Sequence, residues 1–345
     1  MLTIAAWLHD LDPFVFRITE TFGVRWYGLA YVAGFLAAWA ILKTLARRGS
    51  ILLREELVTD LIVTVIVGTL VGGRLGYVLF YSPDLLTSFE SSFPFWGVLA
   101  FHRGGMASHG GMVGIAIASW LFARKHKLSF AHVADCLAFV APVGVFFGRL
   151  ANFINGELLG KIVALPGERA PWWSVKFPQE LVEGHAPELS TDQQEALLEL
   201  LQKVARPEDP PGVAVERLLE AVRAHTPGVR EALEPLISAR HASQLYQAAA
   251  EGIVVGVLLA ALWAKPRKPG VIAAWFLVSY GVGRVLTEFI RLPDAHLAVQ
   301  RIAGLSRGQW LSVLMIVVGA AALWRIGRSS ARAVGGWMSS AQRFS

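Results

Sequence analysis

Seven apolar segments, each long enough to cross a lipid bilayer, dominate this sequence. They lie at about 26–46, 57–80, 106–123, 131–153, 246–264, 271–290 and 310–326. A helix of about 20 apolar residues spans the hydrocarbon core, and only helices or closed barrels satisfy their backbone hydrogen bonds there. Charged residues make up 17% of the chain, against roughly 25% in soluble domains. We therefore expect an all-α polytopic membrane protein with about seven transmembrane helices.

Clusters of basic residues predict the orientation of these helices. Such clusters follow the first, third, fifth and seventh segments, as in the run 124–127 (RKHK) and the run 265–269 (KPRKP). The short loops after the second, fourth and sixth segments lack them. Because cytoplasmic loops carry the excess of Lys and Arg, the N-terminus is expected outside and the C-terminus inside.

Residues 180–240 differ from the apolar body. They carry twelve acidic and six basic side chains, so the overall charge of +6 leaves +12 for the rest of the chain. Ser190 and Gln193 form a capping-box pattern before an amphipathic run. We expect four parts: a transmembrane body in two parts, 1–178 and 241–327, an extracytoplasmic helical insert at 179–240, and a basic cytoplasmic tail at 328–345. The insert has no residues that look catalytic and is interpreted as a cap or a contact surface.

Several classes of function do not fit this sequence. A basic, apolar chain favours anionic lipid headgroups over nucleic acid. Cys136 is the single cysteine, so an internal disulfide and a cysteine-only metal site are excluded. The histidines show no close ligand spacing, and the sequence has no HExxH, CxxC, GxSxG or P-loop motif. No metal site is predicted.

The stretch 148–160, GRLANFINGELLG, is the most unusual part of the chain. It ends an apolar segment, yet it contains Arg149, Asn152, Asn155 and Glu157. Ionisable residues at membrane depth are candidates for function. Arg149 and Asn152 are three residues apart and share a helix face. The Asn155-Gly156 pair predicts a turn that ends the helix, and a snorkelling arginine is the ordinary alternative for such a helix end.

Polar residues at other segment ends are expected on the same side of the membrane. In the predicted topology, His109 and Tyr27 begin the third and first segments at the outer face. Tyr280, Arg284 and Glu288 follow an i, i+4, i+8 pattern on the sixth segment. An Arg284–Glu288 pair that only neutralises itself is the alternative there. Arginine forks bind phosphate and a neutral histidine accepts a proton near pH 7. This inventory is typical of chemistry on a phospholipid headgroup.

Six motifs then give a resemblance to a known family. They are VRWYGL at 24–29, GGRLGY at 72–77, HGG at 109–111, GRLANFINGEL at 148–158, HASQLY at 241–246 and YGVGRVLTEFIRLP at 280–293. With these motifs the chain resembles the bacterial prolipoprotein diacylglyceryl transferases over about 20–178 and 238–325. The insert exceeds the segment usual at this place in the family.

The resemblance implies a reaction and its partners. The diacylglyceryl group of phosphatidylglycerol passes to the lipobox cysteine of a preprolipoprotein signal peptide, and glycerol phosphate is released, with no metal or organic cofactor and no nucleic acid. The enzyme is expected in the bacterial inner membrane, with its site toward the periplasm. The implied catalytic residues are Tyr27, His109, Arg149, Arg284 and Glu288. The implied substrate-binding residues are Arg74, Asn152, Asn155, Glu157, Gly160, Tyr280 and Arg291. For Arg74, a structural pair or a headgroup contact both fit the sequence.

Two other functions fit a seven-helix chain with ionisable residues in its membrane segments. A lipid or proton-coupled transporter is expected to show internal repeats or paired broken helices, and we find no convincing repeat. A catalytically inactive lipid-binding scaffold is disfavoured because each matching functional position holds the residue type of the family.

Overall fold

The computed structural model describes residues 6–19, 23–100, 104–292, 301–302 and 304–338. Pro293 of the sixth motif, and positions 339–345 of the predicted tail, lie outside the described residues. The chain forms two compact units. Unit one comprises 1–34, 142–257 and 277–318, and unit two comprises 35–141, 258–276 and 319–345. Several long helices contribute one part to each unit.

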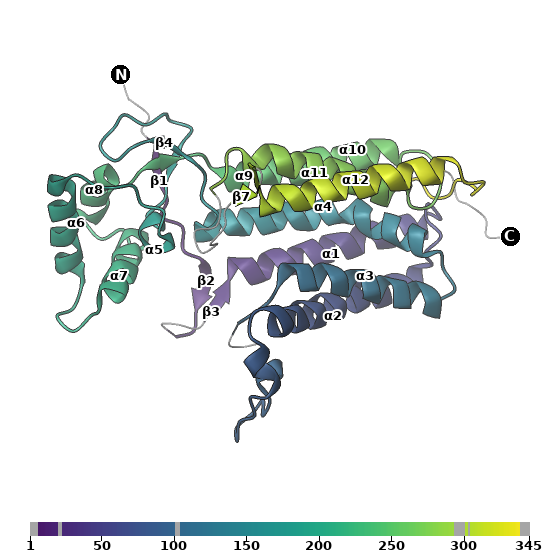
Figure 1. Ribbon diagram of the computed structural model, residues 1–345, viewed down its shortest axis with the longest axis horizontal. Coiled ribbons are helices and arrows are strands. Elements are labelled where there is room, and N and C mark those ends of the chain that lie inside the picture. Colours follow the sequence, from purple (N-terminus) through teal and green to yellow (C-terminus); the bar gives the residue numbers. More distant parts are fainter. Residues whose placement is uncertain (1–5, 20–22, 101–103, 293–300, 303, 339–345) are drawn as a thin grey trace. The chain divides into compact units, whose positions relative to one another are not determined.

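Six helices of the described residues are long and apolar enough to cross a membrane (Figure 1). They are α1 (Trp26–Arg47), α2 (Glu55–Phe80), α4 (Phe130–Asn155), the continuous α9, η5 and α10 (Ser243–Leu262), α11 (Val271–Glu288) and α12 (Arg307–Gly327). Their bounds fall close to the predicted segments. The chain is a polytopic helical membrane protein, as the sequence predicted.

The third predicted segment forms a helix that differs in composition from these six. α3 spans Ser108–Lys125 and is 18 residues long. Its first turn holds His109 and two glycines, and its last turn holds Arg124 and Lys125. These polar ends lower its mean hydropathy, and it is not among the six apolar spans. The count of seven spans therefore stays a prediction.

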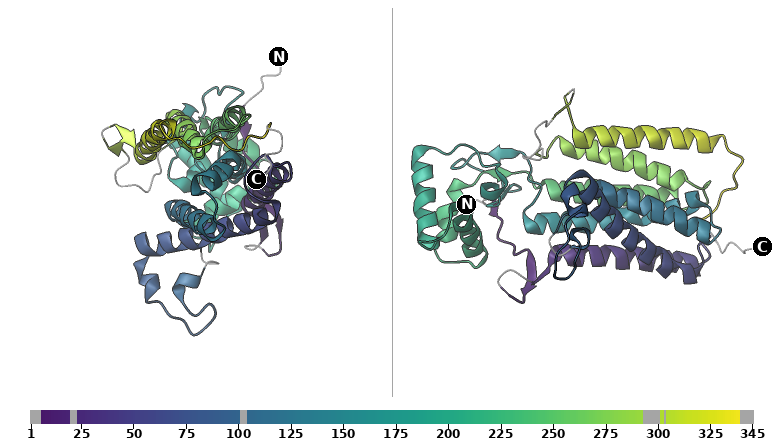
Figure 2. Two further views of the ribbon diagram at one scale, coloured as in Figure 1. Left: turned by 90° about the vertical axis from the view of Figure 1, so that its right-hand side faces the viewer. Right: turned by 60° about the horizontal axis from the view of Figure 1, so that its bottom comes forward.

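In unit two, glycines bring α3 into close contact with α2. A Cβ atom at Gly72 would lie 2.4 Å from the carbonyl oxygen of Gly110, and one at Gly114 would lie 2.0 Å from that of Gly68. Small residues at an interface allow helix backbones to approach in a membrane. α2 and α3 accordingly lie side by side (Figure 1, Figure 2). This packing holds α3, whose first turn carries His109.

Unit one contains a small sheet that the sequence did not predict. Its order is β1-β5-β6-β4, from β1 (Trp7–Leu8), β5 (Val175–Lys176), β6 (Ala239–Arg240) and β4 (Ile162–Ala164). β1 pairs in parallel with β5, and the other pairs are antiparallel. Strands of two or three residues are too short to show the alternating pattern by which strands are recognised. Among the described residues, β2 (Phe14–Arg17) also pairs antiparallel with β3 (Gly23–Arg25), and β7 (Arg301–Ile302) pairs antiparallel with β8 (Leu305–Ser306).

The insert of unit one is helical, as predicted. It contains α5 (Glu180–Glu183), α6 (Thr191–Val204), α7 (Pro211–Arg223), α8 (Val229–Leu233) and η4 (Glu234–Leu236) (Figure 1). The Ser190–Gln193 capping box is formed, with hydrogen bonds of 3.3 and 3.0 Å. The helices share an apolar core that also takes in Leu8 of β1. The N-terminal strand is thereby fixed to the insert.

A buried ion pair joins the two ends of the insert. Arg240 Nε lies 2.7 Å from Glu180 Oε2, and both side chains are almost fully buried. Ser238 N donates to the other carboxylate oxygen at 3.0 Å, and Arg240 Nη1 donates to the carbonyl of Gly160 at 3.2 Å. A buried ion pair is stable when its remaining donors and acceptors are satisfied. The base of the insert is thus held against Gly160, a predicted site residue.

Candidate functional site

The unusual stretch 148–160 ends a helix with a turn, as its Asn-Gly pair predicted. α4 stops at Asn155, and Gly156 has φ +70, a conformation that favours glycine. Gly156 N donates to the carbonyl of Phe153 at 3.0 Å. The side chain of Gln179 packs directly against the turn, because a Cβ atom at Gly156 would lie 2.3 Å from Gln179 Cδ. The positive φ, with Gln179 packed against the turn, therefore favours glycine at this position.

The carboxylate of Glu157 organises the two amides of this stretch. Asn152 Nδ2 donates to Glu157 Oε2 at 3.1 Å, and Asn155 Nδ2 donates to Oε1 at 3.1 Å. The side chain of Gln244 on α9 donates to the Glu157 carbonyl. The structure thus brings together Asn152, Asn155 and Glu157, and it fixes the direction in which each amide presents its oxygen.

Arg149 forms a buried ion pair with a residue that the sequence analysis did not select. Arg149 Nη2 lies 3.0 Å from Glu251 Oε2, and the Glu251 side chain has no exposed surface. Thr287 of α11 donates its hydroxyl to Glu251 Oε1 at 3.0 Å. Tyr280 also lies within hydrogen-bonding reach of Arg149. Glu251 thereby connects the end of α4 to α11.

Glu251 was recognisable from the sequence. It is the single charged residue within the apolar segment 246–264. Charged residues inside a membrane segment are functional candidates by default. The i, i+4 pattern of α11 and the stretch 148–160 stand out by their local spacing. Glu251 is an isolated carboxylate whose partners lie far away in sequence, so no local pattern marks it.

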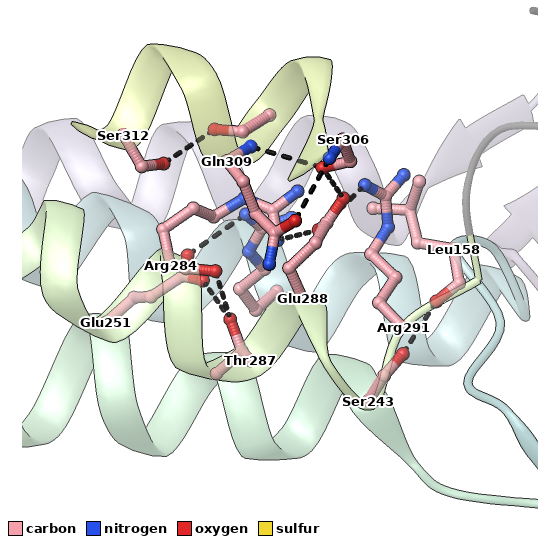
Figure 3. A network of polar contacts seen from close by, with 12 residues as sticks. Leu158, Ser243, Glu251, Arg284, Thr287, Glu288, Arg291, Ser306, Gln309 and Ser312 are labelled. Atoms are coloured by element: carbon pink, nitrogen blue, oxygen red, sulfur yellow. Dashed lines mark hydrogen bonds and ion pairs between the residues drawn. The ribbon is translucent and has the colours of Figure 1, made fainter. Parts of the chain in front are cut away.

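A second ion-pair cluster lies at the end of α11 (Figure 3). Arg284 Nη1 is 2.6 Å from Glu288 Oε2, and Arg291 Nη1 is 3.6 Å from the same oxygen. Ser306 Oγ donates to Glu288 Oε1 at 2.7 Å. Glu288 therefore orients two arginines at once, and Ser306 fixes the carboxylate from β8. Figure 3 also shows Glu251 and Thr287 beside this cluster, so the two ion pairs share one network.

Backbone contacts at Gly160 link the stretch 148–160 to Arg291. Gly160 and Arg291 form an isolated antiparallel bridge. Leu292 N donates to the carbonyl of Leu159 at 3.0 Å. A Cβ atom at Gly160 would lie 2.2 Å from the carbonyl oxygen of His241. Gly160 is needed here because two other chain segments approach its backbone closely, which gives a physical reason for its selection.

Tyr27 lies at the second position of α1 and is half-buried. Its ring packs against that of Tyr31, with 5.3 Å between centroids. Unit one thus contains ten of the twelve predicted site residues: Tyr27, Arg149, Asn152, Asn155, Glu157, Gly160, Tyr280, Arg284, Glu288 and Arg291.

His109 and Arg74 belong to unit two. His109 is the second residue of α3 and is exposed. Arg74 is 3% exposed, and its guanidinium donates to four backbone carbonyls, those of Gly97, Val98, Gly104 and Gly105, at 2.6 to 3.0 Å. These contacts favour the structural interpretation of Arg74, because they fix the loop that leads into α3. The assignment of Arg74 to substrate binding stays a prediction.

The geometry of unit one suits an anionic ligand with a polar headgroup. Arg149 and Arg284 each use one guanidinium nitrogen for their carboxylate, and a guanidinium carries five N–H donors in a fixed fork. Charge-assisted hydrogen bonds are strong where water is scarce. The two arginines come from two apolar helices, so an anion bound by both would lie within the membrane-spanning part of the chain.

Comparison with known proteins agrees with the motifs. A family model described as prolipoprotein diacylglyceryl transferase matches residues 13–325. The chain is 44% identical to the phosphatidylglycerol–prolipoprotein diacylglyceryl transferase of Bdellovibrio bacteriovorus, over 96% of this chain and 97% of the relative. The proteins of the same name from Neisseria gonorrhoeae and Rhodospirillum rubrum are each 37% identical, over 92% and 90% of this chain and 97% and 90% of their own lengths. Because the family model covers most of the chain, and the relatives align over nearly all of it, the chain belongs to the prolipoprotein diacylglyceryl transferase family.

Proposed function

We propose that this protein transfers the diacylglyceryl group of phosphatidylglycerol to the lipobox cysteine of a preprolipoprotein. The relatives carry both substrates in their names, and the family model matches residues 13–325. The observation that carries the proposal is the pair of largely buried arginines, Arg149 and Arg284, each held by a carboxylate on apolar helices. Two arginines in such surroundings are suited to hold the phosphate of a lipid headgroup.

In the proposed step, the cysteine sulfur forms a bond to the terminal glyceryl carbon of the diacylglycerol group. The bond from that carbon to the phosphate ester oxygen breaks, and its electron pair leaves with glycerol phosphate. The thiol proton passes to a base. The sulfur becomes a thioether, so atoms and charge balance without a cofactor. The arginines would stabilise the negative charge that builds on the leaving phosphate, often the largest single contribution to such a step.

The remaining residues have supporting roles in this proposal. Glu288 orients Arg284 and Arg291, while Glu251 orients Arg149. Asn152, held by Glu157, offers its amide oxygen to the headgroup hydroxyls. His109 is proposed as the base, since a thiol of pKa near 8.5 needs one and a neutral imidazole serves near pH 7. The motif at 109–111 and the exposure of His109 on the first turn of α3 support that role.

We also propose that the protein lies in the inner membrane with its site toward the periplasm. The basic clusters after alternate segments support this orientation. The ends of α4 and α11, which carry the two arginines, then fall on the outer side. The preprolipoprotein cysteine is expected to approach from that side.

The experiment is a transfer assay with purified protein in phosphatidylglycerol vesicles. A lipobox peptide is added, and the mass gain on its cysteine is followed for the wild type, for Arg149→Ala and for Arg47→Ala. Arg47 is a matched control because it is an exposed arginine paired to a carboxylate at 2.7 Å, far from the site in sequence.

A diacylglyceryl-sized gain in the wild type and in Arg47→Ala, lost in Arg149→Ala, is the expected result. Absence of any gain with folded protein that still binds phosphatidylglycerol would overturn the proposal. That result would favour an inactive lipid-binding scaffold or a transporter.

A further inference from the structure

His9 is a buried histidine that the proposed transfer step does not use. It follows β1, and only 1% of its surface is exposed. Its ring lies among those of Trp7, Phe153 and Phe177, with centroid separations of 5.3, 5.6 and 5.1 Å. A polar ring in an aromatic environment needs partners for both of its nitrogens.

The partners of His9 determine which form of the ring is present. Nε2 lies 2.8 Å from the carbonyl oxygen of Phe153, which can only accept, so Nε2 carries the proton and donates. Nδ1 lies 3.2 Å from Gln179 Nε2, which donates. With the Gln179 amide in this orientation, Nδ1 is the unprotonated acceptor. The contacts fit the neutral imidazole with its proton on Nε2.

These two partners lie on either side of the turn after α4. The Phe153 carbonyl lies in the last turn of α4, where it also accepts from Gly156 N at 3.0 Å. Gln179 packs onto Gly156, as described above. Asn152 precedes Phe153, and Glu157 follows Gly156. His9 is thus connected to one side of the segment that presents the Asn152 amide by a hydrogen bond to Phe153, and to the other side through Gln179, which packs against Gly156.

We propose that neutral His9 is a positioning residue that holds the end of α4 and the Gly156 turn in the geometry required by the site. It acts through Phe153 and Gln179, and it does not touch the substrate. Its effect on turnover rests on the proposed transferase function. Its effect on the segment 152–159 does not, because that effect is a property of the fold.

Protonation of His9 is incompatible with this arrangement. A second N–H at Nδ1 would point at the NH₂ group of Gln179, so that the bond would break or the Gln179 amide would reverse. The charged groups that act on His9 are Arg223 of α7 and the adjacent Asp10, which forms an ion pair with Arg230. Burial is the largest cause and lowers the pKa of His9 to about 4; the smaller contributions are the Phe153 hydrogen bond, which raises it, Arg223, which lowers it, and Asp10, which raises it. The hydrogen bond from Gln179 to Nδ1 is therefore present at neutral pH and is lost as the pH falls toward 4, whereas Nε2 still donates to Phe153.

The first test measures amide hydrogen exchange of residues 152–159 in the full-length protein, in wild type, His9→Leu and His9→Gln. His9→Gln is the control, because leucine removes the hydrogen bonds whereas the glutamine amide can donate to Phe153. We expect about five- to tenfold faster exchange in His9→Leu, the factor typical of one lost hydrogen bond, with little change in His9→Gln. Unchanged exchange in His9→Leu would overturn the proposal.

The second test follows kcat and KM for transfer from phosphatidylglycerol. His9→Leu should lower kcat by about tenfold with a smaller change in KM, and His9→Gln should restore kcat to within about threefold of the wild type. The ratio of wild-type to His9→Gln activity should fall between pH 6 and pH 4, since only the wild type titrates at this position. A ratio independent of pH, together with wild-type kcat in His9→Leu, contradicts the positioning role.

Two outcomes separate this inference from the proposed function. If the wild type transfers nothing, the proposed function fails and hydrogen exchange alone decides the role of His9. If His9→Leu does not fold, hydrogen exchange of the wild type is instead measured at pH 7 and pH 4. The rates are corrected for intrinsic exchange and compared with those of His9→Gln. Faster exchange at pH 4 in the wild type, but not in His9→Gln, supports the proposal, and equal behaviour of the two proteins refutes it.

Discussion

Replacing Glu251 by glutamine tests whether the buried pair with Arg149 is required by the site. The substitution keeps the shape of the side chain and removes its charge. Glu251 accepts from Arg149 and from Thr287 at 3.0 Å each, and it has no exposed surface. Removing one partner of a buried ion pair typically costs 3–5 kcal/mol, because the other charge stays buried and uncompensated. Arg149 keeps 17% of its side chain exposed, so the lower limit of about 3 kcal/mol applies.

A loss of about 3 kcal/mol corresponds to roughly a hundredfold decrease in kcat/KM if it falls on the transition state. The assay is transfer to a lipobox peptide in phosphatidylglycerol vesicles, with the thermal midpoint measured in parallel. Thr287→Val is the graded control. It removes a single hydrogen bond to the same carboxylate, worth about 1.5 kcal/mol, and is expected to lower kcat/KM by about tenfold.

A double substitution distinguishes a pair from two independent residues. Glu251→Leu alone leaves the Arg149 guanidinium buried without its carboxylate, whereas Arg149→Met with Glu251→Leu removes both charges. The double variant is expected to have a higher thermal midpoint than Glu251→Leu, although neither should be active. Near-wild-type kcat/KM and thermal midpoint in Glu251→Gln would refute the requirement for the pair.

Four further predictions follow from the same contacts. Arg284→Lys keeps the charge but loses the planar fork, so transfer should fail, and near-normal turnover would exclude the phosphate-binding role. Gly160→Ala places a Cβ 2.2 Å from the His241 carbonyl oxygen and should separate the Gly160–Arg291 bridge. We expect lower turnover and a lower thermal midpoint. Unchanged values of both would contradict the close approach. In Arg74→Lys, one ammonium cannot reach four carbonyls, so the thermal midpoint should fall. A defect in phosphatidylglycerol binding at an unchanged thermal midpoint would instead favour a headgroup contact. The pKa of His9 is about 4 in the folded protein and 6.5 in the unfolded chain. His9 should therefore contribute stability that is present above pH 6.5 and is lost as the pH falls toward 4, by up to about 3 kcal/mol relative to His9→Gln. Equal pH dependence of the thermal midpoints of wild type and His9→Gln would argue against this contribution.

The helices were predictable because their causes are local. Each long apolar segment became a helix with bounds close to those expected, and the Asn155-Gly156 turn and the Ser190 capping box formed as their residue types require. The i, i+4 spacing on α11 places Arg284 and Glu288 side by side, and the ion pair that was the alternative interpretation there forms at 2.6 Å. These features depend on residues within a few positions of one another.

The sequence by itself determined the fold class, the helices and the family motifs, since hydropathy and short spacings act along the chain, and it predicted the site residues. Tertiary structure decided which partners the polar groups take. It paired Arg149 with Glu251, which is about a hundred residues away in sequence. It hydrogen-bonded the Arg74 guanidinium to backbone carbonyls and placed His9 against Phe153. It also assembled a sheet from strands of two or three residues. The physical reason is that a buried charge or hydrogen-bonding group must find a partner wherever the packed chain supplies one, and sequence spacing does not specify a partner so far away.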